Sequence, residues 1–107
     1  METFNNATSI AYEASRIVKS SPGKVYGLTG YNSKTAEQFI QLHDAKIVPA
    51  DAAVPKVVFK VAASSNFSLD FGQSGREFST GIVICDSSTA TTKTLGSADC
   101  WFDVQYR

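Results

Sequence analysis

The sequence has no excess of charge of either sign. Its 107 residues include ten Lys and Arg and ten Asp and Glu, so the formal net charge is +0. Nonspecific nucleic-acid binding needs a basic surface that displaces counterions from phosphates, and adsorption to anionic lipid needs polybasic clusters. We therefore expect neither nucleic acid nor a membrane among the partners of this protein.

Long hydrophobic runs are also absent. No stretch reaches the roughly 18–20 apolar residues that span a bilayer, and residues 1–6 lack the features of a signal peptide. We therefore expect synthesis in a cytoplasm, where thiols stay reduced. Cys85 and Cys100 are predicted to be free, buried thiols rather than a disulfide, and two cysteines alone do not make a metal site.

Side chains that carry chemistry are few. His43 is the only histidine, and no Ser-His-Asp or Cys-His pattern accompanies it. The sequence lacks a Gly-x-Ser-x-Gly motif, and residues 72–76 lack the Lys-Ser/Thr pair of a phosphate loop. The aspartates are scattered without the spacing of a calcium loop. We predict no catalytic residue, no cofactor and no metal site, and a structural role for His43.

Strand signals fill the chain from residue 24 onward. They predict strands at residues 24–32, 37–44, 57–61, 67–71, 81–85 and 98–107, with a short edge strand within residues 87–94. The apolar run 81–85 is typical of a strand covered on both faces. The regular turn signals favour an all-β fold, a single jelly-roll-like β-sandwich of about seven or eight short antiparallel strands. Its predicted core is Phe59, Val61, Phe67, Leu69, Phe71, Ile82, Ile84, Phe102 and Val104.

The first 22 residues differ in texture from the rest. They are polar and weakly patterned, and they end in a turn at Pro22 and Gly23. We therefore divide the chain into an extended N-terminal arm, residues 1–22, and a β-sandwich domain, residues 23–107. The arm still carries five large apolar side chains, namely Phe4, Ile10, Tyr12, Ile17 and Val18. It either adds a strand to its own sheet or lies on a neighbouring subunit, and we favour partial docking on another chain.

Two aromatic residues outside the arm have an ambiguous environment. Trp101 alternates away from Phe102, and Tyr31 closes a strand at a turn. Tryptophan is common both in cores and at interface hot spots. We place both residues, together with the five apolar arm residues, in a predicted partner interface.

Several segments resemble a group of small structural proteins of tailed bacteriophages. The resemblance covers residues 24–107 and is carried by VYGLTGYN (25–32), QFIQLHD (38–44), VP (54–55), SLDFG (68–72), FSTGI (78–82) and SSTAT (87–91). It implies a virion structural module of the capsid cement or decoration type. Such a protein is made in the host cytoplasm, resides on the capsid surface and binds the major capsid protein.

Two further expectations accompany this interpretation. Oligomers of one chain are usually symmetric, and a trimer would match the local three-fold positions of a capsid lattice. The alternative function is a receptor- or glycan-binding tip module of a phage tail or fibre. That alternative predicts a concave patch with Trp or Tyr beside Asp, Asn or Gln, for which Trp101 and Asp103 are the candidates.

Overall fold

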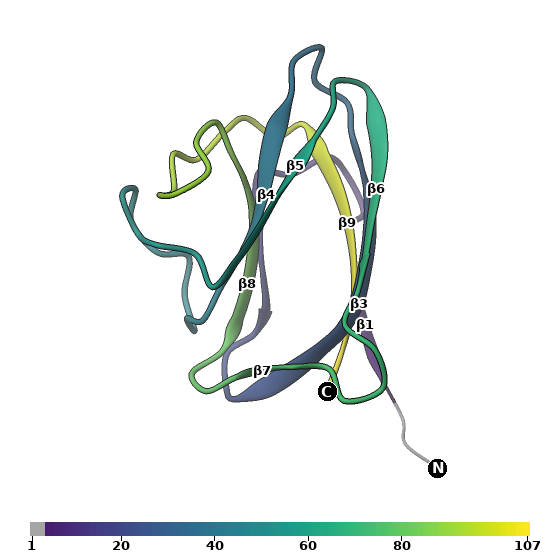
Figure 1. Cartoon of the computed structure of the whole chain (residues 1–107), viewed down its shortest axis with the longest axis vertical. Coiled ribbons are helices and arrows are strands. Elements are labelled where there is room, and N and C mark those ends of the chain that lie inside the picture. Colours follow the sequence, from purple (N-terminus) through teal and green to yellow (C-terminus); the bar gives the residue numbers. More distant parts are fainter. Residues whose placement is uncertain (1–3) are drawn as a thin grey trace.

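Within residues 4–107, nine strands form two antiparallel sheets that face each other across the core (Figure 1). The computed structural model describes residues 4–107. Sheet A contains β1 (Asn5–Thr8), β3 (Gly23–Asn32), β6 (Ser65–Asp70), β7 (Arg76–Phe78) and β9 (Cys100–Tyr106). Sheet B contains β2 (Ser15–Lys19), β4 (Gln38–His43), β5 (Val57–Val61) and β8 (Ile82–Ser87).

The strand order identifies the fold as a jelly roll. Sheet A runs β1-β9-β3-β6, with β7 also paired to β3, and sheet B runs β2-β8-β4-β5. Apart from β7, the chain crosses between sheets after every strand except β4. This nesting of two Greek keys over eight strands is the jelly-roll topology. It confirms the all-β sandwich that the sequence predicts.

The core follows from the two-residue alternation of side chains along each strand. Six of the nine predicted core residues are buried in one cluster, and the other three, Phe59, Leu69 and Phe71, are half-buried and pack against it. Phe102 lies at its centre with no exposed surface, and its ring centroid is 6.4 Å from that of Phe67. The predicted turn after Phe71 is also present, because Gly72 and Gly75 have φ of 77° and 71°.

Both cysteines are free and buried, as predicted. Burial raises the pKa of the Cys85 thiol to about 12, and it raises the pKa of the Cys100 thiol as well. Neither side chain is therefore a thiolate near neutral pH, so both behave as small apolar groups.

Two long connections cover the outer face of sheet B, which explains why every residue of β8 is buried. Residues 44–56 and 88–99 project over this face (Figure 1). Gln41, on β4, donates its side-chain amide to the carbonyls of Thr89, Ala90 and Thr92 at 2.9–3.2 Å. The prediction of an edge strand within residues 87–94 is wrong, because the buried amide takes up the backbone carbonyls that a strand would give to a neighbour.

Replacing Gln41 by Leu tests this anchoring. The change keeps the volume of the side chain and leaves three loop carbonyls without their donor. We expect the free energy of unfolding to fall by about 1–3 kcal/mol in urea titrations, with faster amide exchange in residues 88–94. Gln105→Leu on the exposed face of β9 is the control, for which a change within about 0.5 kcal/mol is expected. Equal effects of the two variants would contradict the anchoring role.

The structure corrects the separation of an arm from the sandwich. β1 pairs with β9, from Asn5 opposite Tyr106 to Thr8 opposite Asp103, and β2 pairs with β8. Val18 is 7% exposed and belongs to the core cluster. Of the two alternatives that the sequence left open, the structure shows the addition of strands to the chain's own sheets. The predicted boundary at residue 22 therefore falls inside a single sandwich and does not separate an arm from a domain.

Candidate functional site

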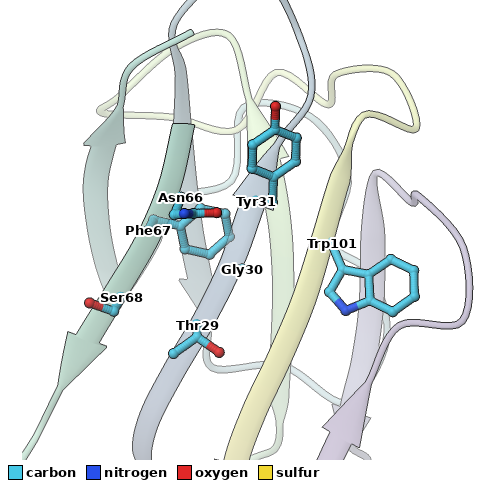
Figure 2. A pocket seen from close by; sticks show the side chains of 7 residues that line it. All are labelled: Thr29, Gly30, Tyr31, Asn66, Phe67, Ser68 and Trp101. Atoms are coloured by element: carbon cyan, nitrogen blue, oxygen red, sulfur yellow. The ribbon is translucent and has the colours of Figure 1, made fainter. Parts of the chain in front are cut away.

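The outer face of sheet A carries the candidate site. Outward-facing side chains on β3, β6 and β9 come together because Tyr31 pairs with Asn66 on one side and with Trp101 on the other. Thr29 and Ser68 lie one step further along the same strands. These residues line a shallow hollow of about 500 Å³ (Figure 2).

A short protruding segment flanks this hollow on the β9 side. The backbone of Ser9 is hydrogen-bonded to Phe102, and that of Glu13 is hydrogen-bonded to Cys100. The three residues between these two anchor points are therefore held beside β9, and all three are exposed. Ile10 is 92% exposed, which is the largest exposure among the big apolar side chains.

Trp101 leans toward this protruding segment rather than toward Tyr31 (Figure 2). Its ring meets the ring of Tyr12 edge-on, with centroids 6.4 Å apart and an interplanar angle of 88°. Ile10, Tyr12, Tyr31 and Trp101 thus form one partly exposed group across β3, β9 and the protruding segment. We call this group the aromatic face.

A second hollow of about 240 Å³ continues along β3 and shares Thr29 and Ser68 with the first. Gly27 lines it without contributing a side chain, and the acids and amides around it are Asp70, Asp103 and Gln105. Thr8 donates to the Asp103 carboxylate at 3.1 Å. The outer face of sheet A therefore changes along its length from aromatic and uncharged to acidic.

The structure brings together four of the seven residues that the sequence placed at an interface, namely Ile10, Tyr12, Tyr31 and Trp101. The other three lie apart. Phe4 is half-exposed with its ring 4.5 Å from that of Tyr26, and Ile17 is exposed on sheet B. Val18 is buried in the core and offers no surface to a partner.

Sequence reasoning missed three polar residues that line the hollow, namely Thr29, Asn66 and Ser68. Their alternation marks them as outward-facing. Only the register between β3 and β6, however, places Asn66 opposite Tyr31.

His43 occupies a structural position under the loops that cover sheet B. It is buried, and its Nε2 lies 2.9 Å from Gln41 Oε1. Burial, with a smaller contribution from Lys93, lowers the pKa of its imidazole. Among residues 4–107, no three His, Cys, Asp or Glu side chains are grouped so that they could hold a metal ion. No helix within this range is long and apolar enough to cross a membrane.

A known structure shows a weak similarity to this sandwich. No protein-family model and no curated protein matches the sequence. Among solved structures, the coat protein of Tobacco streak virus is similar over 95% of this chain and 84% of that chain, with a TM-score of 0.43 and 14% sequence identity. A similarity this weak supports no statement about function, which follows instead from the strand order and the outer face of sheet A.

Proposed function

We propose that this chain is a non-enzymatic structural protein of a virus particle, and that it acts as a capsid cement or decoration protein. The observation that carries the proposal is the strand order, because eight-stranded jelly rolls are a recurrent architecture of viral capsid domains. The resemblance of residues 24–107 to small tailed-phage proteins supports a bacteriophage as the source. A fold alone does not determine a function, so the proposal also needs a suitable contact surface.

The aromatic face supplies that surface. Trp and Tyr are enriched at the centres of protein interfaces, where each one buries a large area at little cost in side-chain entropy. Here they lie beside Ile10, whose exposure has no explanation within the isolated chain. We propose the major capsid protein as the partner on this face, with repetition over many lattice sites multiplying a modest affinity. We also propose a homo-oligomer, with a trimer favoured by lattice symmetry.

Binding to capsids that lack the protein tests this proposal. A cement protein should bind at hundreds of copies per particle, and Trp101→Ala should weaken binding by about 30-fold or more, the effect of losing one interface hot spot. Ile17→Ser is the matched control, because Ile17 is an exposed apolar residue on the opposite sheet. Binding at only a few copies, or equal losses from both variants, would contradict a decoration role through the aromatic face.

The same hollow favours a second candidate, a receptor- or glycan-binding module. Lectin domains also use the jelly-roll fold, and the hollow is lined by Tyr31, by the amide of Asn66 on one side of it and by Trp101 on the other. A glycan array separates the candidates. A glycan module should bind a defined sugar and lose binding in Asn66→Ala, whereas a cement protein should bind capsids and ignore the array.

A further inference from the structure

A buried polar cluster caps the core directly beneath the aromatic face. Asn32 on β3 and Cys100 on β9 are paired neighbours that point inward, next to the outward-facing pair Tyr31 and Trp101. From sheet B, Gln38 on β4 and Asp86 on β8 complete the cluster. The exposures of Asn32, Cys100, Gln38 and Asp86 are 0%, 0%, 1% and 0%.

The cluster has more acceptors than donors. Gln38 Nε2 donates to Asn32 Oδ1 at 2.9 Å and also reaches Cys100 Sγ at 3.6 Å. The Asn32 side-chain amide donates to two backbone carbonyls. Within the part of the chain that the structure describes, Gln38 Oε1 and both carboxyl oxygens of Asp86 have no hydrogen-bond partner. Three buried acceptors thus lie in one cluster, and the donors nearest to the Asp86 carboxyl are the Cys100 thiol and the backbone N–H of Gly96.

Gly96 locates two of these acceptors relative to each other. A Cβ atom built on Gly96 would lie 2.6 Å from Asp86 Oδ1 and 2.8 Å from Gln38 Oε1. Both oxygens therefore border the same small space beside the backbone of Gly96. Both are buried acceptors without a hydrogen-bond partner, which is costly, and a hydrogen shared between them would remove this cost.

We propose that Asp86 is protonated in the folded protein and donates this proton to Gln38 Oε1. A single proton turns one of the three acceptors into a donor and removes the charge of a fully buried carboxylate. Hydrogen bonds then run from Asp86 to Gln38 and from Gln38 to Asn32, so they tie β8 and β4 of sheet B to β3 of sheet A. The buried acid thereby becomes a link between the sheets beneath the aromatic face.

The charges around Asp86 agree with this assignment. Burial, which is the largest effect, raises the pKa of its carboxyl to about 7, and the charge of Asp99 acts in the same direction. Hydrogen bonding from the Cys100 thiol and from the backbone N–H of Gly96 lowers this pKa. Lys34, which follows β3, also lowers the pKa of Asp86. On β8 itself, the preceding titratable group is Cys85, whose side chain faces Gln41 on the other side of the sheet.

The direction of the pH effect follows from this raised pKa. Between the usual value of 3.8 and about 7, the folded protein holds a proton that the unfolded chain releases. The contribution of Asp86 to stability is therefore complete below about pH 4 and is lost as the pH rises to about 7. This pKa difference corresponds to roughly a thousandfold decrease in the folding equilibrium constant. His43 has a lowered pKa and acts in the opposite direction, so the effect must be measured as a difference between variants.

The test compares the wild type with Asp86→Asn by urea unfolding between pH 4 and pH 8. The amide of Asn supplies a permanent donor to Gln38 Oε1, so we expect the stability of the variant relative to the wild type to rise as the pH rises. Glu77→Gln, an exposed acid on β7, is the control and should follow the wild type at every pH. A relative stability of Asp86→Asn that stays constant or falls with rising pH would overturn the proposal.

A second measurement does not depend on the variant folding. The infrared carbonyl band of a protonated carboxylic acid should be visible in the folded wild type at pH 5 and should fade as the pH rises through about 7. Absence of this band at pH 5 would overturn the proposal. Stabilisation of the wild type by added Ca²⁺ or Na⁺ that is lost in Asp86→Asn would also overturn it, because a cation would then occupy the place of the proton.

Discussion

Deletion of residues 1–22 is expected to abolish cooperative unfolding. The truncated chain loses β1 and β2 together, which uncovers one edge of β9 in sheet A and one edge of β8 in sheet B. β8 is buried along its whole length in the intact protein, so the loss of β2 exposes its backbone groups and an apolar edge to solvent. Differential scanning calorimetry should show no single unfolding peak for the truncated chain.

Two controls identify the cause of this loss. Ile10→Ser alters the most exposed apolar residue of the same segment and should change stability by no more than about 0.5 kcal/mol. Val18→Ala leaves both strands in place, removes core volume and should cost about 1–3 kcal/mol. A truncated protein that keeps a cooperative melt at the wild-type temperature would show that residues 1–22 are a separable arm after all.

Gly30→Ala is expected to cost about 3 kcal/mol or more in the free energy of unfolding. Gly30 lies in the middle of β3 with strands on both sides. A Cβ at this position would lie 2.1 Å from the backbone oxygen of Trp101 and 2.2 Å from the ring of Phe67. One obstacle is backbone and the other is a core ring, so the clash requires β9 or the Phe67–Phe102 contact to move.

Gly27→Ala in the same strand is the matched control. Its added Cβ would lie 3.4 Å from its nearest neighbours, which is ordinary van der Waals contact. We expect a change within about 0.5 kcal/mol, measured by urea unfolding of both variants under the same conditions. Similar losses for the two variants would mean that glycine is needed along β3 for its backbone freedom rather than for space.

The strands that could be predicted from the sequence are those in which side-chain alternation and burial agree. In β5, the exposed residues Val58 and Lys60 alternate with Val57, Phe59 and Val61. In β9, the buried residues Phe102 and Val104 alternate with more exposed neighbours. Each of these strands shows the two-residue alternation in its own sequence, so the side chains that face the core can be identified without knowledge of the neighbouring strands. The jelly-roll-like sandwich followed from the number of such strands and the spacing of the turns.

The elements that were missed depend on distant partners. β1 has the sequence Asn-Asn-Ala-Thr, which lacks any apolar alternation, and it is a strand because β9 supplies its hydrogen bonds. Residues 88–94 have a composition that favours strands, but the buried side chain of Gln41 captures their carbonyls. In both places a contact between residues far apart in sequence decides the local structure.

The candidate site was predictable only in part, because contacts between distant strands also determine which of its residues come together. Tyr31 and Trp101 were recognised as exposed aromatics one at a time. Their pairing across β3 and β9, and the placement of Asn66 on the far side of Tyr31, depend on the register of three strands. Val18 was misplaced because it lies in a polar segment, whereas in β2 it alternates with the exposed Ile17 and packs into the core.

The pairing of β1 with β9 also determines when this protein can fold. Asn5 lies opposite Tyr106, so β1 has no partner until β9 has left the exit tunnel of the ribosome. β2 waits in the same way for β8. Because nearly every strand pairs with one distant in sequence, loop closure must precede most of the stabilising contacts. We expect the sandwich to fold only after β9 has emerged, in roughly milliseconds to seconds, as for other all-β domains of high contact order.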